Sequence, residues 1–121
     1  MKSIIVSMIT AAGLMVAGSV FAEDMPALAK KSGCTACHSV DKKIVGPAWK
    51  DVGHAYNSNG ETSTGKKVAD ILGGKSAKEY LMHKVATGGN GNWGNAKMIA
   101  NSPKVSDADI AELVDFVLSH K

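Results

Sequence analysis

The sequence lacks arginine altogether and has few aromatic residues. All 14 of its basic side chains are lysines, and it contains only two each of Trp, Tyr and Phe among 121 residues. Proteins that bind nucleic acids usually combine a strongly basic surface with aromatic rings that stack on bases. A formal net charge of +3 is too small for such a surface. The composition therefore argues against a nucleic-acid partner and fits binding to an acidic protein surface better.

The sequence also lacks a convincing strand pattern, an internal repeat and any break that would mark a second domain. Its apolar residues recur at helical spacing, between segments rich in Gly, Asn and Ser. We therefore predict an all-α protein with a single domain over residues 23–121. A chain of this length builds only a marginal core from its own side chains. A large apolar cofactor would supply much of the core that the few aromatic residues leave missing.

Only two cysteines are present, and both lie in the segment Cys34-Thr35-Ala36-Cys37-His38. This spacing is the attachment signature of c-type haem. The two thiols add to two vinyl groups of the porphyrin, and the histidine that follows is placed to ligate the iron. We therefore predict one covalent haem c on Cys34 and Cys37, with His38 as an axial iron ligand.

Three other uses of a cysteine pair compete with this interpretation. A reversible dithiol centre shares the spacing but is expected near a βαβ pattern. A structural zinc site would use Cys34, Cys37 and His38 but needs a fourth ligand. A disulfide across two residues would close too small a loop to stabilise much. The haem interpretation is favoured, and the other histidines are expected at the surface rather than as ligands: His54, His83 and His120.

The N-terminal residues have the pattern of a secretory signal. Lys2 precedes an apolar stretch that runs to Phe21, and Val20 and Ala22 offer short side chains where a signal peptidase reads. We expect residues 1–22 to be a cleaved signal peptide, with a membrane anchor that stays attached as the alternative. Export to the bacterial periplasm is consistent with a thiol pair, because thiols do not stay free there. Without Lys2 the net charge falls from +3 to about +2.

Helix signals divide the rest of the chain into short segments. Pro26 suits the first turn of one helix, Pro47 is placed to open another, and Gly73 and Gly88 are placed to end two more. Ser106 is placed to cap the last helix, whose apolar stripe runs to Leu118. The predicted helices cover residues 24–33, 47–56, 68–72, 76–87 and 106–118.

These features together resemble the class I cytochromes c, specifically the small single-haem bacterial electron carriers. The resemblance covers nearly all of residues 23–121. A short helix runs directly into the Cys-x-x-Cys-His motif, and residues 46–52 are similar to the family's Gly-Pro-Ala-aromatic-Lys-Asp-Val segment. The resemblance implies the cytochrome c fold, with four or so short helices wrapped around the haem. It also implies that the Pro47 carbonyl accepts a hydrogen bond from His38, which orients the ring and raises its basicity.

The same resemblance assigns the other side of the haem. The family's Trp-Gly, followed at fixed spacing by a ligating methionine, is matched by residues 93–98. Met98 is thereby implied as the sixth iron ligand, with a histidine in its place as the alternative. The resemblance also implies that Trp93 and Lys84 bind haem propionates and that Asn101 supports the methionine sulfur.

Two departures from the family pattern concern this side of the haem. The family usually surrounds its methionine with prolines, whereas residues 97–100 read Lys-Met-Ile-Ala, so a more flexible ligand loop is expected. The segment 57–75 contains extra sequence, which lengthens the connection before the next helix. It either covers a haem edge or is a tolerated surface insertion.

The resemblance implies a soluble periplasmic electron-transfer protein rather than an enzyme. His/Met-ligated haem would cycle between Fe(III) and Fe(II), and contacts with redox partner proteins would be transient and steered by charge. We expect a monomer with no membrane span in the mature form. The alternative is a haem enzyme, or a sensor of peroxide or gas, with an open sixth position. Five lysines either ring an exposed haem edge or form a solvated face: Lys30, Lys31, Lys42, Lys43 and Lys97.

Overall fold

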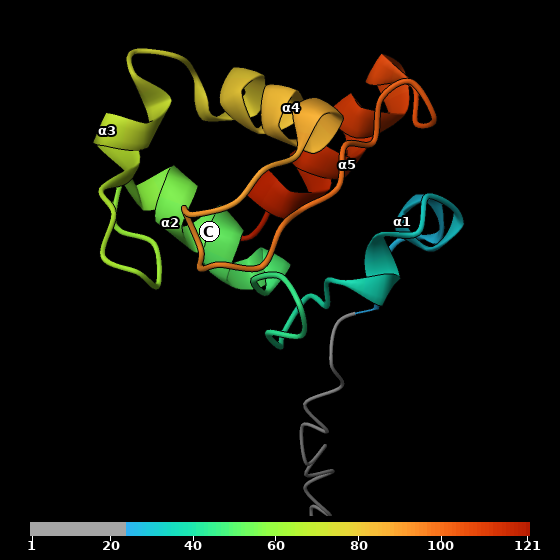
Figure 1. The fold of residues 1–121 in the computed structure, drawn as a ribbon, viewed down its shortest axis with the longest axis horizontal. Helices are drawn as coiled ribbons and strands as arrows, with labels where there is room; N and C mark the ends of the chain where they lie inside the picture. The colour runs from blue at the N-terminus through green and yellow to red at the C-terminus, as the bar shows by residue number, and fades with distance from the viewer. Residues whose placement is uncertain (1–23) are drawn as a thin grey trace, which may run out of the picture.

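The computed structural model describes residues 24–121 and shows an all-helical arrangement (Figure 1). The predicted signal peptide, residues 1–22, lies outside the described residues. Within the described part, α-helices and one short 3₁₀ turn follow one another with no named strand. They are α1 (Ala27–Lys31), η1 (Cys34–Ala36), α2 (Trp49–Ser58), α3 (Val68–Leu72), α4 (Ala77–Thr87) and α5 (Asp107–Leu118). The predicted all-α class is confirmed.

Serine side chains fix the starts of the two longest helices. The Ser76 hydroxyl accepts the N–H of Glu79 at 3.1 Å at the start of α4. The Ser106 hydroxyl accepts the N–H of Asp109 at 3.2 Å at the start of α5. Each bond satisfies an amide that a helix start would otherwise leave without a partner. Both helices therefore begin where the sequence predicts.

The first two helices differ from their predicted bounds. α1 is shorter than the predicted 24–33, and α2 begins at Trp49 instead of Pro47. Ala48 is extended, with ψ of 135°, and the Trp49 and Lys50 amides donate to the carbonyls of Ser39 and Val40 at 3.0 Å. The extended Ala48 therefore keeps residues 47 and 48 out of the helix, and these two bonds tie the first residues of α2 to the residues after the Cys-x-x-Cys-His motif.

Helix α5 lies at the centre of the packing, against α4, α2 and α1 (Figure 1). Its apolar stripe is buried as predicted, whereas Phe116 is only half-buried. At the crossing with α2, a side chain on Gly53 would meet the Val117 and His120 carbonyls. The two helices therefore approach more closely than any larger residue would allow. The buried residues of the stripe are Ile110, Leu113, Val114 and Val117.

A long segment without helix connects α4 to α5 and passes in front of α2 in Figure 1. We call its residues 88–101 the methionine loop. Gly89 and Met98 pair through two backbone hydrogen bonds of 3.0 and 2.8 Å, which closes the loop at its base. The Asn101 amide donates to the Val85 carbonyl at 3.2 Å and ties the end of the loop to α4. Among residues 24–121, no helix has the length and apolar character needed to cross a membrane.

Candidate functional site

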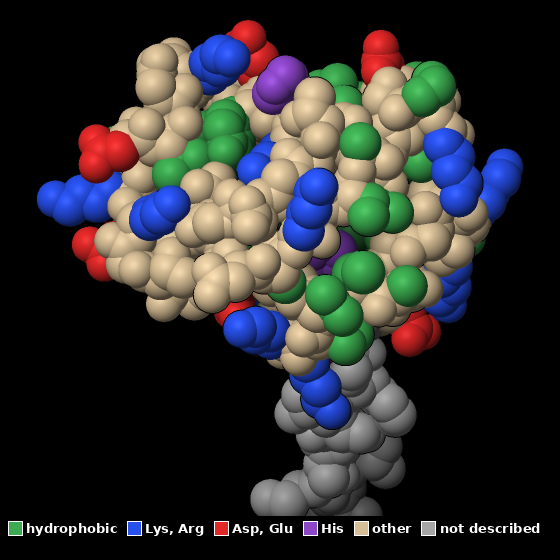
Figure 2. All heavy atoms as spheres, in the orientation of Figure 1, with side chains coloured by type: hydrophobic (Ala, Val, Ile, Leu, Met, Phe, Trp, Pro, Cys, Tyr) green, Lys and Arg blue, Asp and Glu red, His purple; other side chains and the backbone are tan. Residues whose placement is uncertain are grey.

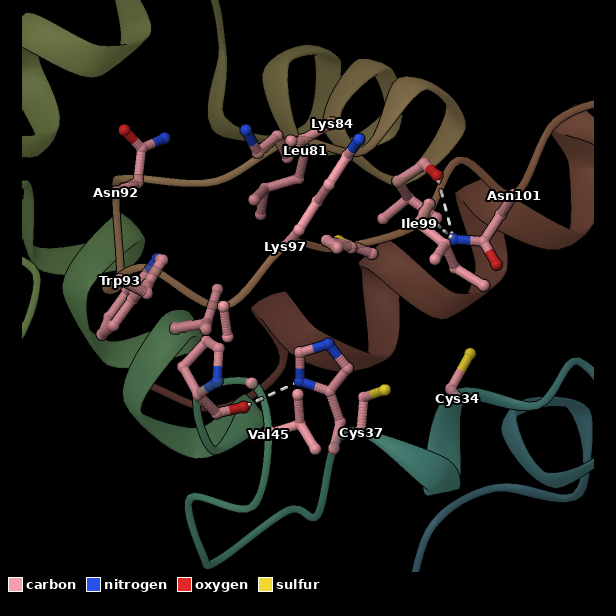
Figure 3. Close-up of a pocket in the computed structure, with 18 of the residues that line it drawn as sticks. Cys34, Cys37, Val45, Leu81, Lys84, Asn92, Trp93, Lys97, Ile99 and Asn101 are labelled. Carbon is pink, nitrogen blue, oxygen red and sulfur yellow. Dashed lines mark hydrogen bonds between the residues drawn. The ribbon is translucent and has the colours of Figure 1, made fainter.

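A cavity of about 340 Å³ lies among the Cys-x-x-Cys-His motif, helices α2, α4 and α5, and the methionine loop (Figure 3). Sites for small molecules and cofactors are typically about 300–1,000 Å³. The cavity wall brings together residues from separate parts of the chain, with Cys34 and Trp93 at opposite ends in Figure 3. It includes every site residue that the sequence predicted: Cys34, Cys37, His38, Pro47, Lys84, Trp93, Met98 and Asn101.

The His38 imidazole is held from one side. Its Nδ1 donates to the Pro47 carbonyl oxygen at 2.8 Å, which leaves the other ring nitrogen, Nε2, free to act as a ligand. Burial lowers the pKa of His38, and the hydrogen bond to Pro47 opposes this effect only in part. The ring is therefore favoured in its neutral form, which is the form that binds metals.

Gly46 provides the space that the His38 ring occupies. A Cβ at this position would lie 2.5 Å from His38 Cε1 and 2.9 Å from Nδ1. Any other residue would force the ring or the backbone to move. This role of Gly46 was not predicted from the sequence, although the residue stands directly before Pro47 in the segment that carries the resemblance.

The two cysteines line the cavity as half-buried side chains that are not joined in a disulfide. They are joined by one tight turn, in which the Cys37 and His38 amides donate to the Cys34 carbonyl at 3.2 and 2.9 Å. Burial raises the pKa of Cys34, which disfavours the thiolate that dithiol exchange uses. Across residues 24–121, no three His, Cys, Asp or Glu side chains are grouped to hold a metal ion, so the zinc alternative finds no support.

Met98 and Trp93 reach the cavity from the methionine loop, and both are half-buried. Burial raises the pKa of Tyr56 to about 12, as does the neighbouring Tyr80, and a hydrogen bond with Trp93 partly offsets both. Asn101 donates through Nδ2 to the Val85 and Ile99 carbonyls at 3.1 and 3.2 Å. These two bonds use both hydrogens of the Asn101 amide. A hydrogen bond from Asn101 to the methionine sulfur therefore stays a prediction.

Lysines gather with apolar side chains around the mouth of the cavity. Figure 2 shows green hydrophobic side chains and blue lysines around a hollow in this face. Lys97 is exposed and lines the cavity, as does Lys104, which the sequence analysis did not single out. The other four lysines of the predicted ring are exposed but do not line it. Three large apolar side chains of the described residues are exposed: Ile44, Val45 and Ile99. Val45 and Ile99 line the cavity, and Ile44 does not.

The remaining histidines lie away from the cavity wall. His54 and His83 are exposed, as predicted. His120 differs from the prediction because it is half-buried: its Nδ1 bonds with the Phe116 carbonyl at 2.9 Å, and its ring packs edge-on against the Phe116 ring. None of the three is placed to replace Met98 in the described structure.

The residues around the cavity fit a covalently attached haem. The donor set consists of two thiols, a neutral imidazole and a thioether, and thiols and imidazole in this arrangement are the attachment and ligand groups of c-type haem. The absence of a side chain at Gly46 leaves the room that the ligating ring needs. Apolar side chains complete the wall and suit the faces of a porphyrin: Val52, Leu81, Val85, Val114 and Val117.

A helical chain that brings this donor set to one cavity defines a protein of the covalent-haem class. The sequence matches the cytochrome c family over residues 22–121, and the chain belongs to that family. Like the family, it carries one covalently attached haem c, and it is a small electron-transfer cytochrome.

Individual relatives and a solved structure agree with this assignment. The chain is 44% identical to cytochrome c-551 of Allochromatium vinosum over 91 residues, which cover 75% of this chain and 80% of the relative. It is 36% identical to cytochrome c-552 of Nitrosomonas europaea over 121 residues, the whole of both chains. The crystal structure of wild-type Nitrosomonas europaea cytochrome c552 superposes with a TM-score of 0.61 at 38% identity, covering 78% of this chain and 96% of that chain.

Proposed function

We propose that this cytochrome is a periplasmic shuttle of single electrons whose haem iron is ligated by His38 and Met98. The observation that carries the proposal is the meeting of Cys34, Cys37, His38 and Met98 at one cavity. Two of these side chains would attach the haem, and the other two would occupy the axial positions of its iron. When bound, the haem supplies the Fe(III)/Fe(II) couple, and a methionine opposite a histidine raises its reduction potential.

The protein contributes to electron transfer by restricting the positions of His38 and Met98. The bond from His38 to Pro47 fixes the orientation of the ring at 2.8 Å and increases the basicity of the ligating nitrogen. The backbone pair of Gly89 and Met98 fixes the base of the loop that carries the methionine. A site whose ligands are already in place needs little rearrangement when an electron arrives or leaves.

Lys84, Trp93 and Asn101 have supporting roles in this proposal. Lys84 lies half-buried in the cavity wall, and its ammonium is close enough to Gly89 that a Cβ there would lie 2.8 Å from Nζ. A lysine at this place would neutralise the charge of a haem propionate. We propose the same partner for the Trp93 indole N–H, which would exchange its hydrogen bond with Tyr56 for one to the propionate. We also propose that Asn101 supports the Met98 sulfur indirectly, because its bonds to the Val85 and Ile99 carbonyls hold the backbone beside Met98.

The protein is proposed to be a carrier and not an enzyme. The residues of the cavity wall include no carboxylate and no histidine besides His38, so the described part of the chain offers no acid–base pair beside the haem. Partner proteins would bind transiently at the cavity mouth, guided by the lysines there. We propose the periplasm as the compartment, on the basis of the secretory pattern in residues 1–22, and a monomeric state.

An absorption spectrum of the purified protein tests the ligand set against the alternative, a haem enzyme or gas sensor with an open position. We expect a low-spin ferric spectrum with the weak red band of a methionine–iron bond, unaffected when carbon monoxide is added to the reduced protein. A high-spin spectrum, or a rapid change with carbon monoxide, would contradict the proposal. Mass spectrometry of the same sample should find one haem attached to the chain.

A further inference from the structure

The segment between α2 and α3 is folded back on itself rather than extended into solvent. The Val68 amide donates to the Gly60 carbonyl at 2.9 Å, and the Thr62 amide donates to the Lys66 carbonyl at 2.9 Å. The Thr62 side chain is a buried polar group, only 5% exposed. This segment belongs to the extra sequence of residues 57–75, for which the resemblance gives no role. We call residues 60–67 the threonine loop.

A chain of hydrogen bonds runs out of the threonine loop. The Lys66 amide donates to Thr62 Oγ1 at 3.3 Å, and the hydroxyls of Thr62 and Thr64 lie 3.0 Å apart. Thr64 Oγ1 then donates to the Asn92 carbonyl at 2.8 Å, across 28 positions of sequence. A hydroxyl has one proton, so Thr62 must donate to Thr64. All three bonds point in one direction, and such chains strengthen each of their members.

Asn92, in the methionine loop, is the last acceptor of these hydrogen bonds, and its side chain makes a second contact. Its Nδ2 donates to the Tyr80 hydroxyl at 2.7 Å, which fixes it to α4. The Tyr80 ring in turn stacks on Tyr56 of α2 with 6.0 Å between ring centroids. Asn92 directly precedes Trp93 and lies at the same end of the cavity in Figure 3. The position of Trp93 is therefore set by contacts with both the threonine loop and α4.

The methionine loop needs such external supports because its own sequence does little to stiffen it. Residues 97–100 contain no proline, and Gly91 and Gly94 have positive φ values of 101° and 129°. Its internal backbone bonds are few: Gly91 donates to Gly94 at 2.9 Å, and Gly89 pairs with Met98. Two longer side-chain bonds join them, from Asn90 to the Asn95 carbonyl at 3.4 Å and from Asn101 to the Ile99 carbonyl at 3.2 Å. Glycine leaves more backbone freedom to be lost on folding than any other residue. Contacts from outside the loop thus add to the Gly89–Met98 pair in restricting the positions of Trp93 and Met98.

We propose that Thr64 is a positioning residue for the sixth iron ligand: its bond to Asn92 braces the methionine loop and so keeps Met98 in place at the haem. The inference rests on the proposed His/Met ligation for its consequence at the iron. The brace itself lies in the chain and can be measured without reference to the ligand. The extra segment 57–75 then replaces, from outside the loop, the stiffness that prolines around the methionine would give.

Thr64→Val tests the proposal in the haem-loaded protein, because valine keeps the shape of threonine and removes the hydroxyl. Thr87→Val is the matched control: the Thr87 hydroxyl donates to the His83 carbonyl at the same 2.8 Å, but within a single helix. Thr64→Ser restores the hydroxyl. The first readout is amide hydrogen exchange of Gly91 and Met98, with α5 amides as the internal reference. The second is the urea concentration at which the red band disappears, compared with loss of helix.

In Thr64→Val we expect the Gly91 and Met98 amides to exchange about two- to tenfold faster, the range that one hydrogen bond represents. The α5 amides should be unchanged, the red band should disappear at lower urea while the helices persist, and Thr64→Ser should behave as wild type. Loop exchange equal to that of wild type and Thr87→Val would overturn the proposal. A missing red band in the wild-type protein would instead refute the ligation of Met98, and the exchange rates would still decide whether Thr64 braces the loop.

Discussion

The side chain of His38 and the backbone of Pro47 are joined by a hydrogen bond of 2.8 Å, from the ring Nδ1 to the carbonyl oxygen. The bond links the end of the Cys-x-x-Cys-His motif to the residues just before α2. It is short because the intervening Gly46 has no side chain, and because the Gly46 amide itself donates to the Cys37 carbonyl at 2.8 Å. The Pro47 carbonyl, the Gly46 amide and the missing side chain of Gly46 thus together determine the orientation of the His38 imidazole.

Gly46→Ala should disturb this arrangement. The new methyl group would lie 2.5 Å from His38 Cε1, so we expect the ring to turn away, with a loss of stability of about 1–3 kcal/mol, as is typical of an overpacked site. The haem should stay attached through its thioethers, while the ferric spectrum gains a high-spin component. Urea unfolding and the absorption spectrum measure the two effects. Gly60→Ala is the control, because its Cβ would meet only the Ser58 hydroxyl, at 3.0 Å, and the Ala55 carbonyl oxygen at an ordinary contact distance of 3.9 Å. Equal stability and equal spectra of the two variants would contradict a special role of Gly46.

Met98→Ala should remove the weak red band and lower the reduction potential. The expected drop is a sizeable part of the roughly 0.8 V over which axial ligands set haem potentials. Met82→Ala serves as the control, since Met82 is a half-buried methionine on α4 that does not line the cavity. Redox titration and the red region of the absorption spectrum give the two readouts. A red band that persists in Met98→Ala would show that another group ligates the iron.

Residues whose role depends on near neighbours in the sequence were predictable, and residues whose role depends on contacts with distant segments were not. The spacing of Cys34, Cys37 and His38 alone predicts their role. Ser76 and Ser106 cap helices through amides three positions away. The start of α2 was wrong by two residues because Ala48 is extended, and the first two residues of the helix, Trp49 and Lys50, donate to the carbonyls of residues 39 and 40. Thr64 and Asn92 are 28 positions apart, and no periodic pattern connects them. The sequence showed Gly46 as part of the segment similar to the family, but it did not show that this glycine makes room for the His38 ring.

The lysines at the cavity mouth should make electron exchange depend on charge. We expect oxidation of the reduced protein by ferricyanide, an anion, to slow as salt is added, because salt screens the attraction. Oxidation by a cationic cobalt complex should instead become faster. Lys104→Gln should weaken the salt dependence with ferricyanide more than Lys75→Gln, because both lysines are exposed but only Lys104 lines the cavity. Stopped-flow rates that do not change with ionic strength would refute a role for the lysines at the cavity mouth.

Tyr56 should make stability fall at high pH. Burial, together with neighbouring Tyr80, raises the pKa of Tyr56 from 10.0 to about 12. The folded protein therefore keeps the phenol proton where the unfolded chain has begun to lose it, so this contribution is complete below about pH 10 and is lost as the pH rises toward about 12.

Tyr56→Phe has no such proton to lose and isolates this contribution from the titration of the lysines. We expect the difference in unfolding free energy between wild type and Tyr56→Phe to be constant up to about pH 9, and then to shift against the wild type through about pH 12. Urea unfolding followed by circular dichroism at each pH measures it, with haem absorbance showing that the cofactor stays bound. If the two stability curves stay parallel across this interval, the Tyr56 phenol has the same pKa in the folded and unfolded chains, and its burial beside Tyr80 and Trp93 does not raise that pKa.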